Sequence, residues 1–236
     1  MTANANLGSP PSNRPLIAPA WHTTGFVAIF VGLSVIGGFF QHAVKQQPQA
    51  TAASGSFVPG YISVVIVEWL LVLYVRMGIH KRGMGLRDLV GGRWATSQEV
   101  MKDIALGAGL WAVWIGLMNP HLLGGGTNAA QGLLPRGILE SLVWIPVALS
   151  AGFCEEVAFR GYLQKQFQAM TGSDGWAVVF QAMVFGIGHL YEGVGAAGRI
   201  SLFGVLFGLL ALWRKNLRPG MIAHAWSDIF GVIIFR

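Results

Sequence analysis

The chain has 236 residues, of which 53% are hydrophobic and only 11% are charged. A soluble domain of this size could not bury so much apolar surface, so the composition predicts a single polytopic helical membrane domain. The net charge of +6 is not typical of a nucleic-acid-binding protein, because the Lys and Arg residues are grouped between apolar segments and not along one helix face.

Apolar segments of helical length recur along the chain, which predicts an all-α bundle with about seven transmembrane helices. We expect these helices over residues 21–44, 58–76, 104–119, 138–168, 175–191, 199–213 and 219–235. The small-residue stretches 51–57 and 124–132 are expected to be loops.

Domain organisation follows from the same pattern. Residues 1–20 combine Pro and polar residues without the order of features of a signal peptide, so we expect a flexible N-terminal tail. Residues 21–236 are expected to form a single membrane-embedded domain, and the polar motifs described below lie within about 138–236.

Basic residues are concentrated in two connections, and their positions predict the topology. Six lie between residues 76 and 102 and three between residues 214 and 218. We expect both connections and the turn near Thr171 in the cytoplasm, and both termini outside. Residues 84–103 alternate apolar and charged side chains, which fits either a short helix on the membrane surface or a solvated connector.

Two adjacent acids, Glu155 and Glu156, stand in the run EEVAFR inside an apolar segment. An ionisable group in hydrocarbon costs several kcal/mol or more, so such a group indicates a function. Glu156 and Arg160 are four residues apart and are expected to form an ion pair on one helical face. Glu155 points about 100° away from that face and therefore needs a partner on another helix.

The turn signal TGSDG at 171–175 predicts an antiparallel helical hairpin, from which depth along each helix can be counted. Glu155 lies sixteen residues before the turn begins and His189 fourteen after it ends. Both are therefore roughly 20–25 Å along their helices from the turn. We expect Glu155 to face His189, an arrangement that fits a carboxylate base oriented by an imidazole.

A third segment brings further polar groups to a similar depth. His224 and Asp228 are four residues apart, so both side chains can address one cavity. Phe185 shares a helical face with His189. In the second predicted helix, Glu68 is another intramembrane acid, for which structural pairing inside the bundle is preferred over a substrate or proton role.

Three short motifs therefore occur in order in the last part of the chain. They read EEVAFR from Glu155 to Arg160, FGIGH from Phe185 to His189 and HAWSD from His224 to Asp228. The set resembles the EExxxR, FxxxH and HxxxN or HxxxD motifs of the CAAX-protease and bacteriocin-processing (CPBP/Abi) family of intramembrane proteases, which is related to the CAAX prenyl endopeptidases.

The resemblance implies an intramembrane endopeptidase in which Glu155 and His189 activate water and His224 helps to stabilise the oxyanion. It gives Glu156, Arg160 and Phe185 supporting roles. Asp228 departs from the prenyl-protein branch, which has asparagine at this position. Asp228 could donate to an oxyanion only if protonated; otherwise it orients His224 or binds metal.

Metal dependence stays open at this point. Glu155, His189 and His224 match a catalytic zinc set of one carboxylate and two histidines. The chain has no HExxH helix, however, and relatives of this type are also regarded as glutamate-dependent proteases, so we favour a site without a metal cofactor.

The expected partners are the lipid bilayer and a peptide or membrane-protein substrate, with lipid-modified substrates as one option and no nucleic acid. The expected location is a bacterial inner membrane, with the site opening toward the cytoplasm. Two alternatives from other classes are a non-catalytic scaffold or bacteriocin self-immunity protein of the same fold, and a proton-coupled transporter. The chain lacks the paired halves and broken helices of many transporters.

Overall fold

A computed structural model describes residues 14–45, 57–118, 135 and 137–234, and every element within them is a helix. The elements are α1 (Ala20–Lys45), α3 (Val58–His80), α4 (Leu86–Val90), α5 (Ser97–Leu117), α7 (Gly137–Glu155), the π-helix η2 (Glu156–Leu163), α8 (Gln164–Thr171), α9 (Asp174–Ile187), the 3-10 turn η3 (Leu190–Glu192), α10 (Val194–Arg214) and α11 (Arg218–Ile234). The predicted loops 51–57 and 124–132 lie almost entirely outside the described residues.

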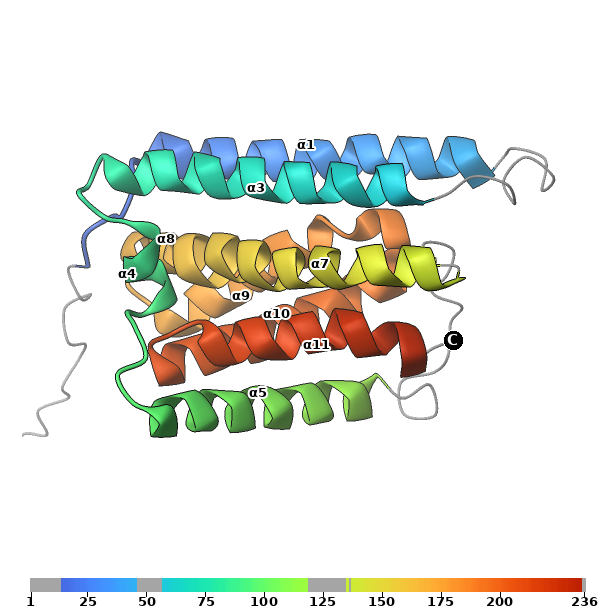
Figure 1. The fold of residues 1–236 in the computed structure, drawn as a ribbon. Helices are drawn as coiled ribbons and strands as arrows, with labels where there is room; N and C mark the ends of the chain where they lie inside the picture. Colours follow the sequence, from blue (N-terminus) through green and yellow to red (C-terminus); the bar gives the residue numbers. More distant parts are fainter. Residues whose placement is uncertain (1–13, 46–56, 119–134, 136, 235–236) are drawn as a thin grey trace, which may run out of the picture.

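The helices form a bundle around the central rod α7–η2–α8 (Figure 1). α7 packs against α3 on one side and α11 on the other, and α11 packs in turn against α5. α9 packs against both α8 and α10, and α1 contacts α3, α9 and η3. The all-α class predicted from the sequence is confirmed.

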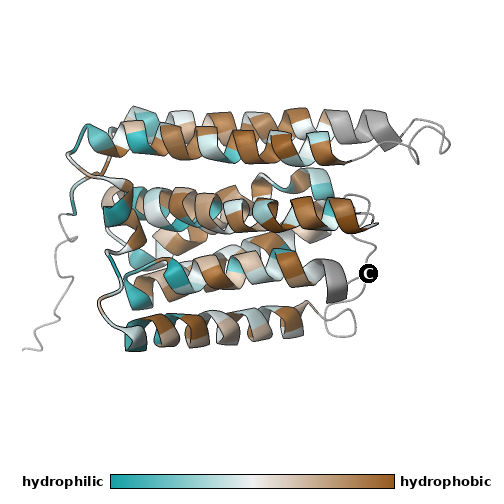
Figure 2. Ribbon diagram, viewed as in Figure 1, coloured by the Kyte–Doolittle hydropathy of each residue, from teal (hydrophilic) through white to brown (hydrophobic). Residues whose placement is uncertain are grey.

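Five of the described segments are long and apolar enough to cross a membrane: α1, α3, α5, the rod α7–η2–α8 and α10. α9 and α11 have only 14 and 17 residues, so the predicted number of seven is not confirmed. Large apolar side chains such as Phe39 and Ile138 are more than 70% exposed, and hydrophobic residues follow the helices over most of their length (Figure 2). Lipid is the solvent that suits such a surface, and the chain is a membrane protein.

One end of the bundle collects the polar connections, and we name it the basic end. It holds the connection 81–96, the turn Gly172–Ser173 and the connection Lys215–Leu217 (Figure 1). Hydrophilic residues gather at this end (Figure 2). The turn forms as predicted, because Gly172 adopts a left-handed conformation with φ of +67° and Ser173 caps α9 by accepting from Trp176 N–H.

The N-terminal segment also lies at the basic end. Gln166 accepts from the N–H groups of Ile17 and Ala18 at 2.9 and 3.2 Å, and its amide donates to Ala18 O at 3.0 Å. Arg14 pairs with Asp174 at the start of α9. Residues 14–19 of the predicted flexible tail are therefore held in place. The sequence predicted that both termini lie opposite the basic connections, but α1 starts at the same end as both connections, so for the start of α1 this prediction is wrong.

The stretch 84–103 is divided between two elements. Only Leu86–Val90 forms a separate short helix, while α5 begins at Ser97, earlier than the predicted residue 104. Thr96 accepts from Glu99 N–H at 3.2 Å, and Glu99 accepts from Ala95 N–H at 2.8 Å. The Thr96 cap satisfies one of the first N–H groups of α5, and the Glu99 contact fixes the chain just before the helix, which explains its early start.

A buried acid ties α5 to the neighbouring helices at the basic end. Asp103 accepts from Arg214 at 2.6 Å and from Trp94 Nε1 at 2.8 Å, and it pairs with Arg218 at 3.4 Å. The two arginines and the indole N–H of Trp94 thus offset the free-energy cost of burying the Asp103 carboxylate. The ion pairs fix the end of α10 and the start of α11 relative to α5.

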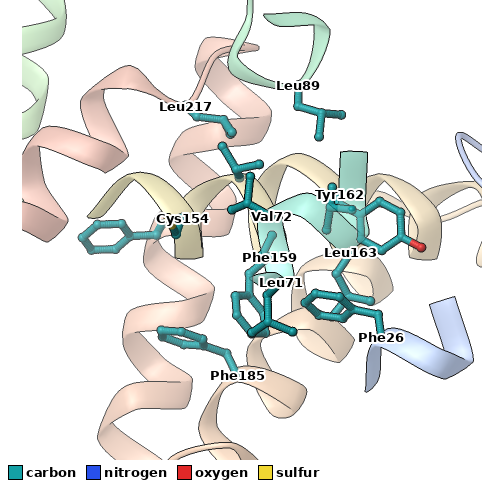
Figure 3. Close-up of a cluster of buried hydrophobic side chains, with 14 of the residues drawn as sticks. Phe26, Leu71, Val72, Leu89, Cys154, Phe159, Tyr162, Leu163, Phe185 and Leu217 are labelled. Atoms are coloured by element: carbon teal, nitrogen blue, oxygen red, sulfur yellow. The ribbon is translucent and has the colours of Figure 1, made fainter. Parts of the chain in front are cut away.

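The hydrophobic core surrounds the π-helix η2. Figure 3 shows side chains from separate parts of the chain in this cluster, and among them are Phe26 of α1, Leu71 and Val72 of α3, Leu89 of α4, Phe159 and Tyr162 of η2, and Phe185 of α9. Each is no more than 8% exposed. The segment that carries the first motif is therefore the most enclosed part of the bundle.

Gly152 permits the close contact between α7 and α11. A Cβ added at this position would lie 2.9 Å from the backbone nitrogen of Ala225 and 3.0 Å from Met221 O. Backbone atoms cannot move aside as a flexible side chain can. A substituent at Gly152 would therefore push α11 away from α7.

We expect Gly152→Ala to destabilise the protein by about 1–3 kcal/mol, because the added methyl group overpacks this contact. Thermal unfolding of the purified protein in detergent measures the change. Gly109→Ala on α5 is the matched control, since a Cβ there meets no atom within 4 Å. Equal melting temperatures for the two variants would contradict the packing argument.

Candidate active site

The first motif lies where the central rod changes its helical register. α7 ends at Glu155, and η2 begins at Glu156 and closes with a bond from Gln164 N–H to Phe159 O, which are five residues apart. Such i→i+5 turns are rare and are frequently found at functional sites. The sequence predicted an uninterrupted helix over 138–168. The π register turns the motif's side chains away from the positions that a regular α-helix would give them.

Glu156 and Arg160 form the predicted ion pair. Arg160 Nη1 lies 3.0 Å from Glu156 Oε1, and the side chains are 1% exposed or less. The guanidinium carbon also lies 4.5 Å from the ring centroid of Phe185 and about 5.5 Å from those of Phe203 and Phe207. The carboxylate and the aromatic faces together offset the loss of water around this buried cation.

His224 connects α11 to both acids of the motif. Its Nδ1 lies 3.0 Å from Glu156 Oε1, while its Nε2 lies 3.6 Å from Glu155 Oε2 and 3.8 Å from Asp228 Oδ2. An ionised Glu156 can only accept, so the proton of that hydrogen bond is on Nδ1. The His224 ring is thereby held with Nε2 directed toward the two remaining carboxylates.

His189 lies near this group without contacting Glu155. Its Nδ1 donates to Phe185 O at 2.8 Å, and its ring centroid is 4.9 Å from that of Phe185. The Phe185 ring lies 6.4 Å from His224. Within the described chain, no hydrogen bond or ion pair joins His189 to Glu155, so the direct pairing expected from the sequence is not formed.

The reason for this difference is local structure. α9 ends at Ile187, so His189 lies beyond the helix and its direction is not set by helical periodicity. Glu155, the last residue of α7, meanwhile faces α11. The imidazole that contacts Glu155 is therefore that of His224.

The acids differ in their access to the surface. The side chain of Glu156 is 1% exposed, whereas those of Glu155 and Asp228 are 21% and 33% exposed. In the part of the chain that the structure describes, Glu155 has no hydrogen bond. Glu155 and Asp228 are therefore the acids of this group that are partly accessible from the surface, whereas Glu156 is not.

Glu68 has the structural partner that we expected. Ser150 Oγ donates to Glu68 at 2.8 Å and accepts from Trp69 Nε1 at 3.0 Å. Ser150 lies on α7 and thereby links α3 to the central rod. Glu68 is also close enough to interact electrostatically with Glu155 and Asp228.

Sequence reasoning missed Phe203 and Phe207 of α10, which pack against both Arg160 and His224. Their ring centroids lie 4.8 and 5.9 Å from that of His224. The run FGVLFG at 203–208 carried a signal, because it repeats an aromatic followed by a glycine at four-residue spacing on one helix face. Gly204 and Gly208 let α9 and the rod approach these rings.

Glu155, His189 and His224 are the candidate ligands of the zinc alternative. Among the described residues, no group of three or more His, Cys, Asp and Glu side chains is arranged to hold a metal ion. His189 Nδ1 and His224 Nδ1 are both engaged in hydrogen bonds within the protein, so only the Nε2 atom of each ring could bind a metal. Glu155, His189 and His224 are not grouped as a metal centre in this arrangement, and metal dependence stays a prediction.

Comparison with known proteins gives a family match that covers all three motifs. Residues 137–230 match the family described as Rce1-like, type II CAAX prenyl endopeptidase Rce1-like. This part of the chain therefore resembles an Rce1-like domain. The Rce1-like domain extends from the start of α7 into α11 and includes all three motifs, while α1, α3, α4 and α5 lie outside it. No curated protein and no solved structure gives a significant match. The Rce1-like domain supports an intramembrane endopeptidase of the CAAX-protease type.

We expect Glu156→Gln and Arg160→Met each to destabilise the protein by about 3–5 kcal/mol, because each leaves the opposite charge buried without its partner. The double variant is expected to lose less than the sum of the two, since it removes both charges. Thermal unfolding in detergent measures all three. Strictly additive losses would contradict a direct interaction between these side chains.

Proposed function

We propose that this chain is a membrane-embedded endopeptidase and that Glu155 is its general base. The observation that carries this proposal is the different surroundings of the two adjacent acids. Glu156 is enclosed, neutralised by Arg160 and hydrogen-bonded to His224. Glu155 is partly exposed and faces His224 Nε2 at 3.6 Å without a hydrogen bond of its own within the described residues. Of the two acids, Glu155 is the one that can meet a water molecule.

In the proposed reaction, Glu155 takes a proton from a water molecule as its oxygen attacks the carbonyl carbon of the scissile peptide bond. The carbonyl oxygen becomes an oxyanion in the tetrahedral intermediate. When the carbon–nitrogen bond breaks, Glu155 returns the proton to the leaving amine. The products are a new carboxyl group and a new amino group.

His189 is proposed to act on the attacking water, and His224 on the oxyanion. His189 donates from Nδ1 to Phe185 O, so in the neutral ring Nε2 is a free acceptor that can orient the water. His224 donates from Nδ1 to Glu156, and when Nε2 also carries a proton it can donate to the oxyanion. Glu156, Arg160 and Phe185 hold these two rings in place.

Asp228 lies one helical turn after His224, with its carboxylate 3.8 Å from Nε2. This distance is too long for a direct hydrogen bond. It suits a carboxylate that orients His224 electrostatically, one of the roles considered from the sequence. A protonated Asp228 that donates to the oxyanion is the other role that needs no metal.

The proposed substrate is a peptide or membrane protein that reaches the site from the bilayer, and a lipid-modified peptide is the first to test because of the Rce1-like domain. The proposed location is the inner membrane of a bacterium, with the basic connections and the opening of the site on the cytoplasmic side.

We expect Glu155→Gln to lower the cleavage rate of a prenylated or amphipathic membrane peptide by roughly 10²–10⁴-fold, because the amide cannot accept the proton of water. Mass spectrometry of the peptide products measures cleavage by the purified protein in detergent. Glu140→Gln is the matched control, since Glu140 lies near the start of the same helix and accepts from Phe57 N–H at 2.9 Å, which a glutamine oxygen can also do.

The outcome also decides between the proposal and its alternatives. His189→Ala and His224→Ala are expected to lose activity with Glu155→Gln, while Glu140→Gln keeps it. Cleavage by the Glu155→Gln variant at the rate of the parent protein would overturn the assigned base. A cellular phenotype that is unchanged in Glu155→Gln would favour a non-catalytic scaffold or immunity protein.

We expect cleavage to continue, within about twofold, after dialysis against a strong chelator, because the proposed mechanism activates water with a carboxylate and not with a metal ion. The cleavage assay with and without chelator measures this. Loss of activity on chelation, followed by recovery with Zn²⁺, would show that the zinc alternative is correct.

A further inference from the structure

A cavity of about 370 Å³ opens at the basic end of the bundle. It lies between α8, the connection from α10 to α11 and the N-terminal segment. Its wall carries Arg14, Lys165 and Lys215, and the single acid among its lining residues is Asp174. Asp174 is already paired with Arg14. The remaining charge of the wall is therefore positive.

The floor of the cavity is formed by two buried polar side chains that lack partners. Arg160 and Gln164 both line it and are 1% and 2% exposed. Among the described residues, Arg160 Nε and Nη2 and Gln164 Oε1 have no hydrogen-bond partner. Arg160 Nη1 contacts Glu156 as an ion pair only, and Gln164 Nε2 donates to Gly208 O at 3.1 Å. Buried polar atoms of this kind are rare and require an explanation.

Lys165 and Lys215 both have N–H donors that make no hydrogen bond within the described chain. Lys165 Nζ gives one hydrogen bond, to Asp88 O at 3.1 Å, and has three donors. Lys215 is exposed, occupies the left-handed C-cap position of α10 and has no polar side-chain contact within the described chain. Two ammonium groups above one guanidinium form a donor set that suits a tetrahedral oxyanion.

We propose that this cavity binds a phosphate group, either in the headgroup of an anionic phospholipid or as free phosphate. Arg160, Lys165 and Lys215 donate to the phosphate oxygens. Gln164 Oε1 accepts from a hydroxyl group, such as that of a glycerol headgroup or of hydrogen phosphate. The cavity lies at the end where the long apolar helices leave the hydrocarbon, which is the depth of the headgroup layer.

The location of Arg160 connects this cavity to the candidate active site. Arg160 lines the cavity, and its guanidinium pairs with Glu156, which in turn holds His224. A phosphate bound at Arg160 would fix the orientation of that chain of contacts. This consequence rests on the proposed function, whereas phosphate binding itself does not.

Binding is tested with the full-length protein, delipidated in detergent. Three probes are titrated separately: inorganic phosphate, short-chain phosphatidylglycerol and, as the net-neutral control, short-chain phosphatidylcholine. The apparent melting temperature reports saturable binding. The parent protein is compared with Lys165→Gln/Lys215→Gln, and Lys102→Gln is the matched control, because Lys102 is exposed on α5 and does not line the cavity.

We expect saturable stabilisation by phosphatidylglycerol, by phosphate or by both, with affinity roughly tenfold weaker in the double variant and unchanged in Lys102→Gln. Stabilisation by phosphatidylglycerol alone identifies the headgroup, and stabilisation by phosphate as well shows that the free ion also binds. If the double variant does not fold, Lys215→Gln alone decides, because that side chain is exposed.

The proposal is overturned if neither anion binds saturably, if phosphatidylcholine stabilises as well as phosphatidylglycerol, or if the lysine variants bind as the parent protein does. Cleavage assays at saturating probe form a separate arm. If a probe binds but the cleavage rate does not change, the proposed phosphate site is retained and only its proposed effect on His224 is rejected.

Discussion

The ion pair between Arg160 and Glu156 is the constraint on which the rest of the site depends. A bundle surrounded by lipid has no water to solvate a charge, so each buried charge must find its partners within the protein. Arg160 obtains a carboxylate and a set of aromatic faces, and Glu156 obtains the guanidinium and His224. Because these requirements are met from η2, α9, α10 and α11 together, the pair fixes how four separate elements of the bundle meet.

The two adjacent glutamates acquire different chemistry from this arrangement. Glu156 neutralises Arg160 and is closed to the surface. The carboxylate of Glu155 is not paired with Arg160 and lies beside the imidazole of His224. The division occurs at the junction of α7 and η2, where the two neighbouring glutamates contact opposite sides of the same histidine ring. In the proposed function, the enclosed Glu156 positions His224 and the accessible Glu155 performs the proton transfers.

Close helix contacts support the site from outside it. Gly152 brings α7 against the backbone of α11, and the glycines after Phe203 and Phe207 bring α10 against α9 and the central rod. At the basic end, the elements are joined by hydrogen bonds and ion pairs. Gln166 holds the N-terminal segment, and Asp103 links α5 to α10 and α11. The candidate catalytic groups and the proposed phosphate cavity therefore share one rigid neighbour, Arg160.

The sequence by itself determined what depends on local spacing and composition: the all-α membrane class, the hairpin turn near Gly172, and the ion pair between residues four apart. Only the tertiary structure decided that His224 contacts Glu155, that His189 bonds instead to the backbone of Phe185, and that the segment before α1 lies at the basic end. Helical periodicity fixes the direction of a side chain only within a regular helix. A π register, a residue beyond a helix end and a docked tail are set by long-range packing, which adjacent residues do not encode.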